Sequence, residues 1–333
     1  MITVMIIMLV LGNDDNEEKE VEEEHEEEEQ EEESRKRKCG RKRIRGWRKR
    51  KRRMWKNFST STHAQFIDAQ QSSPVRVASF NIKQFGESKM SKPAVAENIV
   101  RILKRYDIVF VMETRDKDQK SLEQLKKLLG AAEWTFVASD PIGRTSSYKE
   151  QYVFFFRPHL LTLQDKAIIF QDDEDKFERE PIVAQFEYWS SFANAKVKVT
   201  FVGAHLDPDD VVNELNALPD VIATAESLFP TSSAVIVMGD FNSDCTYMNC
   251  EERAETALFS TPEVYTSLVP DKTDTTVSHN TDCAYDRVVI TVHDRPKVKV
   301  TKVKAFNFEK ELGLQLDEAQ DISDHYPVEF ILE

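Results

Sequence analysis

The sequence contains no glycine-rich phosphate loop and no internal repeat, and it has only nine glycines in 333 residues. These absences exclude a P-loop nucleotide-binding protein and a repeat array. An apolar run at residues 1–11 is too short to span a bilayer as a helix. We therefore expect no stable association with a membrane. A hydrophobic content of 40% is enough for a full core in one large domain or two small ones.

Cysteine is also scarce, with four residues at positions 39, 245, 250 and 283. A disulfide that closes a loop of roughly 40 residues would stabilise the fold by about 4 kcal/mol in an oxidising compartment. Four reduced thiols are the alternative, and spacing alone leaves both possibilities open.

Charge is distributed in blocks along the chain. Residues 14–33 hold fifteen acidic side chains, and residues 35–56 hold fifteen basic side chains and no acid. The rest of the chain then carries a net charge of about −15. An acidic domain cannot hold a polyanion by bulk charge. A nucleic-acid substrate would therefore require a local basic strip and bound cations, and a substrate of another kind also remains open.

The N-terminal region predicts no packed structure. Residues 1–12 are similar to a signal-peptide core that lacks the usual preceding basic residues, and the alternative is an apolar start without a targeting role. The acidic and basic blocks within 13–73 have almost no apolar content and predict a disordered tail. The basic runs 35–38 and 48–53 support a nuclear localisation signal or nucleic-acid arm, whereas 50–53 is also similar to a processing site in secreted proproteins.

Residues 74–333 predict one α/β domain, a sandwich of mixed sheets, because many strand-like runs have few helices between them. The predicted strands are 75–81, 107–113, 134–138, 152–156, 182–186, 197–204, 234–240, 287–292, 298–303 and 326–332. Helices are predicted from Ser91, as N-cap, to about Arg105, and over 209–228. Polar residues gather where these strands end, which is where sites are usually built.

Two histidines lie among acidic and amide residues at such strand ends. His205 follows an apolar strand, and His325 precedes the last one. Taken singly, each is more often a buried structural histidine. Phosphodiester hydrolysis, however, needs a base for water, an acid for the leaving oxygen and carboxylates for a divalent cation. Glu150 and Asp286 are candidate partners for the imidazoles, but the sequence does not show which carboxylate pairs with which histidine.

Oxygen ligands for a hard cation end three predicted strands. Asn81 ends the first, Glu113 ends the second, and Asp240 with Asn242 ends a central one. One or two carboxylates with an amide suffice for Mg²⁺, which keeps several of its waters. Any one of these residues alone is more often a strand-end cap, but their joint occurrence with two histidines favours a metal site.

Nine motifs, in order and at compatible spacing, resemble deoxyribonuclease I and its close relatives, and together they are highly specific. They are residues 81–86, 105–108, 113–116, 147–152, 179–181, 238–242, 274–276, 283–287 and 323–329. The resemblance covers about residues 75–333. It implies the four-layered sandwich of the endonuclease/exonuclease/phosphatase superfamily, with two mixed, mostly antiparallel β-sheets flanked by helices.

The resemblance also implies roles at the catalytic centre. His205 is the general acid, oriented by Glu150, and His325 is the base that activates water, oriented by Asp286. The residues implied to bind metal or the scissile phosphate are Glu113 as main metal ligand, Asn81, Asp240, Asn242 and Asp324. The DNA-binding residues implied are Arg115 and Tyr148 in the minor groove, and Arg179 and Tyr285 on phosphates.

Further sites carried over from the resemblance are structural. A disulfide joins Cys245 to Cys283, which favours oxidation and hence secretion. The calcium ligands implied are Asp274 and Thr276 at one site, and Asp175, Phe177 (through its carbonyl) and Glu180 at a second. The chain also departs from the family. Met112 replaces a glutamine, a second small disulfide is missing, and one extra residue lies between Asp274 and Cys283. The positions that bind actin in some relatives hold Phe136, Ala138 and Ile182, so actin binding is not assumed.

These observations favour a Mg²⁺- or Mn²⁺-dependent endonuclease with structural Ca²⁺. It would act as a monomer on mainly double-stranded DNA, with low sequence specificity, and leave 5′-phosphate and 3′-hydroxyl ends. The same hydrolytic site acting on lipid or sugar phosphates is the alternative function. A binding protein without turnover is a third hypothesis, but it would be expected to lack a histidine or Glu113. Secretion is the favoured localisation, with the nucleus as the alternative.

Overall fold

The computed structural model describes residues 74–145, 149–292 and 296–333. Apart from Asn249–Glu251, these residues belong to one compact unit, Gln65–Met248 with Glu252–Glu333. The predictions for the apolar start, for the charged tail and for Tyr148 lie outside the described residues. Within the described part of the chain, no helix has the length and apolar character needed to cross a membrane.

Two six-stranded sheets form the centre of the unit. Across the first sheet the strands are β11 (Val300–Ala305), β12 (Val328–Leu332), β1 (Val75–Phe85), β2 (Ile108–Thr114), β4 (Gln151–Phe156) and β3 (Thr135–Ala138). Across the second they are β5 (Leu161–Ile169), β6 (Ile182–Ser190), β7 (Ala195–His205), β8 (Val235–Asp240), β10 (Asp286–Thr291) and β9 (Tyr265–Ser267). Each sheet has a single parallel pair, β1 with β2 and β7 with β8, and the other neighbours are antiparallel.

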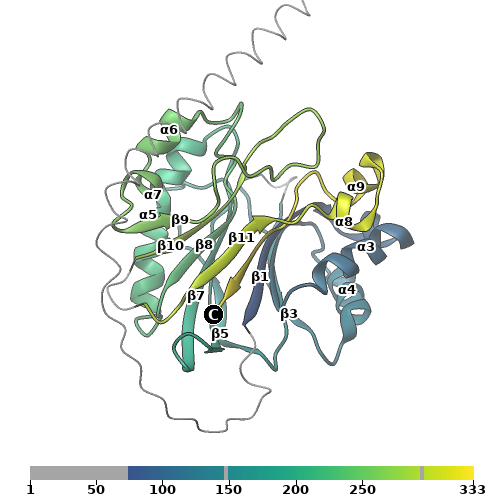
Figure 1. Ribbon diagram of the computed structural model, residues 1–333, viewed down its shortest axis with the longest axis horizontal. Helices are drawn as coiled ribbons and strands as arrows, with labels where there is room; N and C mark the ends of the chain where they lie inside the picture. Colours follow the sequence, from purple (N-terminus) through teal and green to yellow (C-terminus); the bar gives the residue numbers. More distant parts are fainter. Residues whose placement is uncertain (1–73, 146–148, 293–295) are drawn as a thin grey trace, which may run out of the picture. The chain divides into compact units, whose positions relative to one another are not determined.

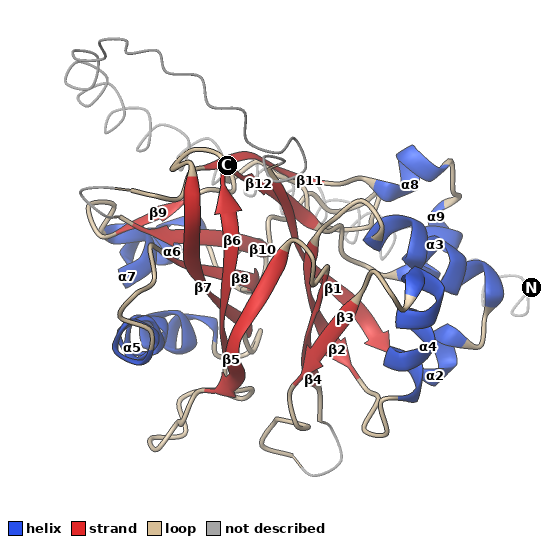
Figure 2. Ribbon diagram, turned by 90° about the horizontal axis from the view of Figure 1, so that it is seen from below, coloured by secondary structure: helices blue, strands red, loops and turns tan. Residues whose placement is uncertain are grey.

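Helices cover the outer face of each sheet, so the unit has four layers (Figure 2). Those packed on the first sheet are α2 (Glu87–Met90), α3 (Pro93–Leu103), α4 (Lys120–Gly130), α8 (Phe308–Leu312) and α9 (Leu316–Ile322). On the second sheet lie α5 (Val211–Leu228) and α7 (Ala257–Ser260), and a short helix α6 (Cys250–Glu255) precedes α7.

Three apolar clusters hold these layers together because side chains alternate along each strand. On β1, Val77 faces the other sheet and packs in the central cluster with Phe110 and Phe201. Its neighbour Ala78 faces the helices and packs with Ile99 of α3. Strands buried on both faces read as continuous apolar runs, which is why they were recognisable in the sequence.

The predicted fold class is therefore confirmed, and the ten predicted strands all occur with shifted ends. The N-cap assigned to Ser91 is wrong. Helix α3 begins at Pro93 with Lys92 as its N-cap, and Ser91 instead ends the preceding short helix α2. Proline favours the first position of a helix because it lacks the N–H that would be unpaired there.

Candidate active site

The topology brings the candidate residues to one edge of both sheets. Asn81 and Glu113 lie near the carboxyl ends of the parallel strands β1 and β2, and His205 and Asp240 end the parallel strands β7 and β8. Neighbouring strands that run the opposite way begin at this edge, so Glu150 precedes β4, Asp286 begins β10 and His325 precedes β12. Residues far apart in the chain thus meet because of strand direction.

His205 and Glu150 form a buried pair. Nδ1 of His205 lies 2.9 Å from Oε2 of Glu150. The backbone N–H of His205 donates to the hydroxyl of Tyr152, and its carbonyl accepts from Nε of Arg179 at 3.0 Å. Burial and Arg179 act to lower the pKa of His205, but Glu150 and Asp240 outweigh them and raise it. The two carboxylates therefore favour the protonated, proton-donating form of the imidazole.

His325 and Asp286 form the second pair. Nδ1 of His325 lies 2.8 Å from Oδ2 of Asp286. Burial acts to lower the pKa of His325, but the carboxylates of Asp240 and Asp286 raise it to about 10. The hydroxyl of Thr275 positions Asp286 by accepting from the backbone N–H groups of Tyr285 and Asp286.

Both rings direct their second nitrogen at one oxygen. Nε2 of His325 is 3.4 Å from Oδ2 of Asp240, and Nε2 of His205 is 3.8 Å from the same atom. The two nitrogens are therefore no further apart than the sum of these distances. Two imidazoles, each fixed by a carboxylate on Nδ1, thus face one small region.

Asn81, Glu113 and Asp240 form a candidate metal centre beside this region. Nδ2 of Asn81 donates to Oε1 of Glu113 at 3.0 Å and to Oδ2 of Asp240 at 3.1 Å. Among the described residues, Oδ1 of Asn81 is buried without a hydrogen-bond partner. Such an oxygen is costly to bury unless something else binds it. Carboxylate and amide oxygens are the ligands of Mg²⁺, so this donor set fits a hard divalent cation.

Asp240, Asp286 and His325 are a second possible metal group, since their ligand atoms lie within 4.8 Å of one another. Because Nδ1 of His325 already pairs with Asp286, a cation bound by this group would take Nε2 of His325, the nitrogen that faces Asp240. The set with Asn81 and Glu113 does not use this nitrogen, and we favour it for that reason.

Strained backbone surrounds the centre. Glu113 and Asn242 have φ values of 54° and 48°, in the left-handed region that residues with a side chain rarely adopt. The backbone N–H of Asn242 donates to Oδ1 of Asp240, and its Nδ2 donates to the carbonyl of Leu206. Asn242 thus fixes the two strand ends that carry Asp240 and His205. Strain of this kind is typical of functional sites, where the surrounding contacts stabilise it.

Two predicted site residues lie in surroundings that the sequence did not indicate. Arg179 is buried and supports the His205 carbonyl, with Nη1 4.0 Å from Oε1 of Glu150. Oδ2 of Asp324 accepts from Nζ of Lys83 at 2.6 Å. Burial acts to raise the pKa of Asp324, but His325 and Lys83 outweigh it and lower it.

The other two DNA-binding candidates lie at the surface of the site. Arg115 is exposed and directly follows β2. The ring of Tyr285 lies close to those of His325 and Tyr247, with centroid distances of 6.2 and 5.3 Å. Burial raises the pKa of Tyr285 to about 12, so its hydroxyl stays protonated.

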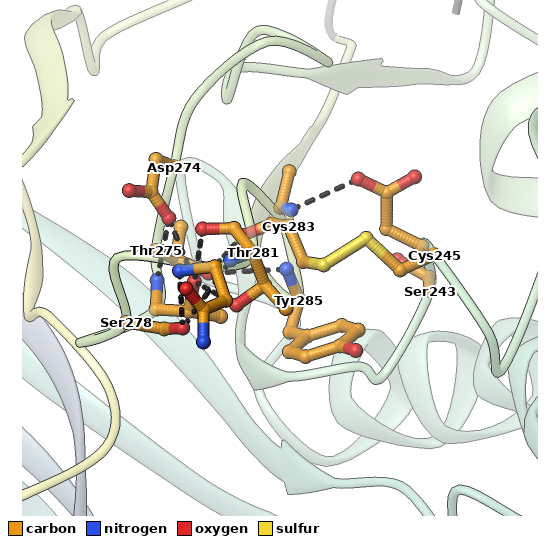
Figure 3. The surroundings of a disulfide bond; sticks show 12 residues. Ser243, Cys245, Asp274, Thr275, Ser278, Thr281, Cys283 and Tyr285 are labelled. Carbon is orange, nitrogen blue, oxygen red and sulfur yellow. Dashed lines mark hydrogen bonds between the residues drawn. A yellow bond between two sulfur atoms is a disulfide. The ribbon is translucent and has the colours of Figure 1, made fainter. Parts of the chain in front are cut away.

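The disulfide between Cys245 and Cys283 is present, with a Cα–Cα distance of 5.8 Å. It lies beside the turn that carries Asp274 and Thr275 (Figure 3). In that turn, the hydroxyl of Thr276 donates to Oδ1 of Asp274 at 2.8 Å. The two oxygens of this predicted calcium site are therefore adjacent.

The second predicted calcium loop already holds a cation from the chain itself. Nε of Arg144 donates to Oδ1 of Asp175 at 3.0 Å, and Nη2 donates to the carbonyl of Asp175. The N–H of Phe177 donates to Asp172, and Glu180 follows Arg179 in the same loop. Since the guanidinium occupies the Asp175 carboxylate, this donor set does not fit a calcium ion unless Arg144 moves away.

Sequence reasoning missed two residues that position the site. Ser323 donates to the carbonyl of Asn81 and accepts from the N–H of His325, so it links the metal centre to the second histidine. Glu214 of α5 is buried and accepts from the N–H groups of Glu178 and Asp207. Glu178 directly precedes Arg179 in the chain, and Asp207 follows His205 by two residues. An acidic residue in a predicted helix gives no signal that it is buried.

Comparison with known proteins identifies the family. The model of the Endonuclease/Exonuclease/phosphatase family matches residues 78–325. The chain is 37% identical over 269 residues to Deoxyribonuclease-1 of Bos taurus, covering 78% of this chain and 92% of that protein. It is 38% identical over 268 residues to Deoxyribonuclease-1 of Gallus gallus, with the same coverage. Deoxyribonuclease-1-like 2 of Homo sapiens is 34% identical over 287 residues, covering 80% and 94%.

Solved structures agree on the fold. A humanized D. rerio TDP2 superposes with a TM-score of 0.55 at 15% identity, covering 78% of this chain and 99% of that one. The human Nocturnin catalytic domain gives a TM-score of 0.53 at 15% identity, covering 78% and 94%. At such low identity, these likenesses concern the fold alone.

Proposed function

Because the chain belongs to the deoxyribonuclease I family of endonuclease/exonuclease/phosphatase proteins, as its sequence motifs indicated, we propose that it is a deoxyribonuclease. It hydrolyses phosphodiester bonds within double-stranded DNA, with little sequence preference, and leaves 5′-phosphate and 3′-hydroxyl ends. The observation that carries this proposal is the pair of buried imidazoles whose Nε2 atoms both face Oδ2 of Asp240.

The mechanism divides acid and base between the two rings. His205, with its raised pKa, protonates the leaving 3′ oxygen from Nε2 while Glu150 holds Nδ1. His325 takes the proton of the attacking water at Nε2, and Asp286 stabilises the imidazolium that forms. A scissile phosphate between the rings places both nitrogens on opposite oxygens of one phosphorus.

His325 must be neutral before it can act as a base, yet its anionic neighbours raise its pKa. Glu113, Asn81 and Asp240 would hold Mg²⁺ or Mn²⁺, whose charge offsets these carboxylates and stabilises the negative charge that develops on the phosphate. Asp324 and Asn242 complete the polar surroundings of this centre. The dependence on a divalent cation follows from that arrangement.

Substrate contacts belong to residues around the rings. Arg115 and Tyr148 enter the minor groove, and Tyr285 and Arg179 stabilise phosphates next to the scissile bond. Asp274 and Thr276 bind structural calcium. At the loop of Asp175, Phe177 and Glu180, calcium binding requires Arg144 to leave.

We further propose that the chain acts as a secreted monomer, since its disulfide is stable in an oxidising compartment. Actin binding is not part of this proposal. Ile182, at one of the corresponding positions, is buried in the central cluster and is not available to a partner.

Nicking of supercoiled plasmid by the purified chain tests the proposal. His205→Ala and His325→Ala are each expected to lower the rate by at least about 100-fold, the usual contribution of a general acid or base. His159→Ala is the matched control, because His159 is exposed in the turn between β4 and β5. EDTA should abolish nicking in the parent. Undiminished nicking by either active-site variant would refute the assigned roles.

Substrate class and product ends need separate measurements. Parallel assays with inositol phosphates and sphingomyelin decide between DNA and the lipid or sugar phosphates of the alternative function. The 5′ ends of the nicked DNA should become labelled by a polynucleotide kinase only after phosphatase treatment, and the 3′ ends should prime a polymerase without prior treatment.

A further inference from the structure

A basic pocket lies at the opposite end of β1 from the active site. It has a volume of about 260 Å³ and is lined by Arg76, Arg105, Tyr106, Lys302, Lys304, Glu329, Phe330 and Ile331. Arg76 precedes Asn81 by five residues on the same strand, which corresponds to about 17 Å. The pocket is therefore separate from the catalytic centre.

The pocket opens on the outer face of the first sheet, where the helical layer ends. Along β1, Arg76 shares a face with Ala78, which packs under the helices, but Arg76 itself is exposed. The register continues this surface across the sheet, since Arg76 pairs with Ile331 of β12 and Lys304 of β11 pairs with Glu329. Strands β1, β12 and β11 lie side by side at this edge (Figure 1).

Four cationic side chains line this space and Glu329 is the one carboxylate among its lining residues. Two carboxylates outside the lining act on the same cations, since Asp107 accepts from the backbone N–H of Arg76 and Glu333 lies within electrostatic range of Lys302. Glu329 accepts from the hydroxyl of Tyr106 at 2.9 Å and from Nη2 of Arg105 at 3.2 Å, and it lies 3.4 Å from Nζ of Lys304. Arg76 and Lys302 make no ion pair with a described residue. An excess of positive charge is thus concentrated on a domain whose net charge is strongly negative.

Two further features indicate that these cations are arranged for a ligand. The guanidinium of Arg105 lies 3.6 Å over the ring of Phe306, and among the described residues its Nε is buried without a hydrogen-bond partner. Lys302 has a φ of 54° at the point where the register between β11 and β12 shifts. A β-bulge of this kind changes the direction of a side chain at a sheet edge.

We propose that this pocket binds phosphate groups of the DNA backbone and is a second DNA-binding site, remote from the catalytic histidines. Guanidinium and ammonium groups together suit phosphate oxygens, and backbone contacts need no sequence recognition. Such a site holds a long substrate on an acidic enzyme, whose overall charge repels it. The choice of DNA over another phosphate compound rests on the proposed function.

Charge reversal at Arg76 and Lys302, the two lining cations that form no ion pair with a described residue, tests the site. The variant Arg76→Glu with Lys302→Glu is compared with the control Lys127→Glu with Lys166→Glu, which changes the net charge equally at exposed positions elsewhere. Binding of a labelled duplex of about 30 base pairs is measured in EDTA, so that no cleavage occurs. The pocket variant should bind about tenfold more weakly than the control at 50 mM salt. Its plot of log affinity against log salt should be shallower by about 2, because two phosphates are no longer neutralised.

Turnover separates this site from the catalytic centre. On plasmid DNA the pocket variant should show a KM about tenfold higher than the control with kcat unchanged, because the histidine pairs are untouched. Equal affinity and salt dependence in the two variants would overturn the proposal. The binding measurement tests the pocket even if the parent chain does not cut DNA, in which case the proposed function fails separately.

Binding of inorganic phosphate is the last measurement. If the pocket binds free phosphate and not the phosphates of DNA, inorganic phosphate would raise the melting temperature of the control but not of the pocket variant. That stabilisation, together with equal duplex affinity in the two variants, would show that the pocket binds free phosphate and would overturn the assignment to DNA.

Discussion

Removal of the disulfide between Cys245 and Cys283 should cost a large part of the stability of the domain. The bond closes a loop with a sequence separation of 38 residues. The chain-entropy model gives about 4 kcal/mol for a loop of this length. For a domain of this size, such a loss lowers the melting temperature by about 8–16 °C. The affected segments follow β8 and precede β10, the strands that carry Asp240 and Asp286.

Chemical denaturation of the parent, Cys245→Ala and the double variant Cys245→Ala with Cys283→Ala measures this effect. The single and double variants should lose about the same free energy of unfolding, because either change removes the bond. A reductant should destabilise the parent and leave the double variant unchanged. The reasoning is refuted if the double variant unfolds at the same denaturant concentration as the parent, or if the reductant destabilises both equally.

Three further changes test the packing, the calcium loop and the pH dependence. A Cβ at Gly239 would lie 1.8 Å from the carbonyl oxygen of Ala204, and the backbone of Gly239 has a φ of 152°. Gly239→Ala should therefore lower the free energy of unfolding, measured in urea, by about 3 kcal/mol. Arg144→Ala frees the carboxylate of Asp175, so calcium should raise the melting temperature of this variant by more than that of the parent, and equal shifts would contradict the idea. Burial raises the pKa of Glu214 from 4.5 to about 7. Between these two pH values the folded chain keeps a proton on Glu214 that the unfolded chain has released. The free energy of unfolding should therefore fall by about 3 kcal/mol as the pH rises from 4.5 to 7. Glu214→Gln should lack this decrease, and unfolding of parent and variant at pH 5 and pH 8 compares them.

The strands of the two sheets were predictable to different degrees. Strands buried on both faces, such as β8, appear in the sequence as short apolar runs and were found. Strand β5 was missed because it is half-exposed and carries Gln164, Asp165 and Lys166 among its apolar residues. Helix α4 was also missed. Its amphipathic pattern is short. Its N-cap is Gln119, which is not one of the residue types that mark a helix start in a sequence and which makes no side-chain cap hydrogen bond.

The candidate active site was also predictable only in part. Residue type and position at strand ends indicated a hydrolytic centre with two histidines, and the family motifs added partners for each ring. Whether a charged residue is exposed or buried does not follow from a motif. Arg179, which we propose contacts a DNA phosphate, is buried and donates to the carbonyl of His205, and neither fact could be predicted from its motif. The pairing of Arg144 with Asp175 joins two loops whose proximity no local pattern encodes.

The sequence by itself determined most of the segments that form strands, which residues can do acid, base and metal chemistry, and to which family the chain belongs. These properties are local, since they depend on side-chain type and on the alternation of apolar residues. Only the tertiary structure decided that both imidazoles face the same oxygen of Asp240, because this depends on the directions of strands distant in the chain. It also decided that cations from β1, β11 and the segment before β2 surround one pocket, because the order of strands across a sheet is set by the packing of the whole domain.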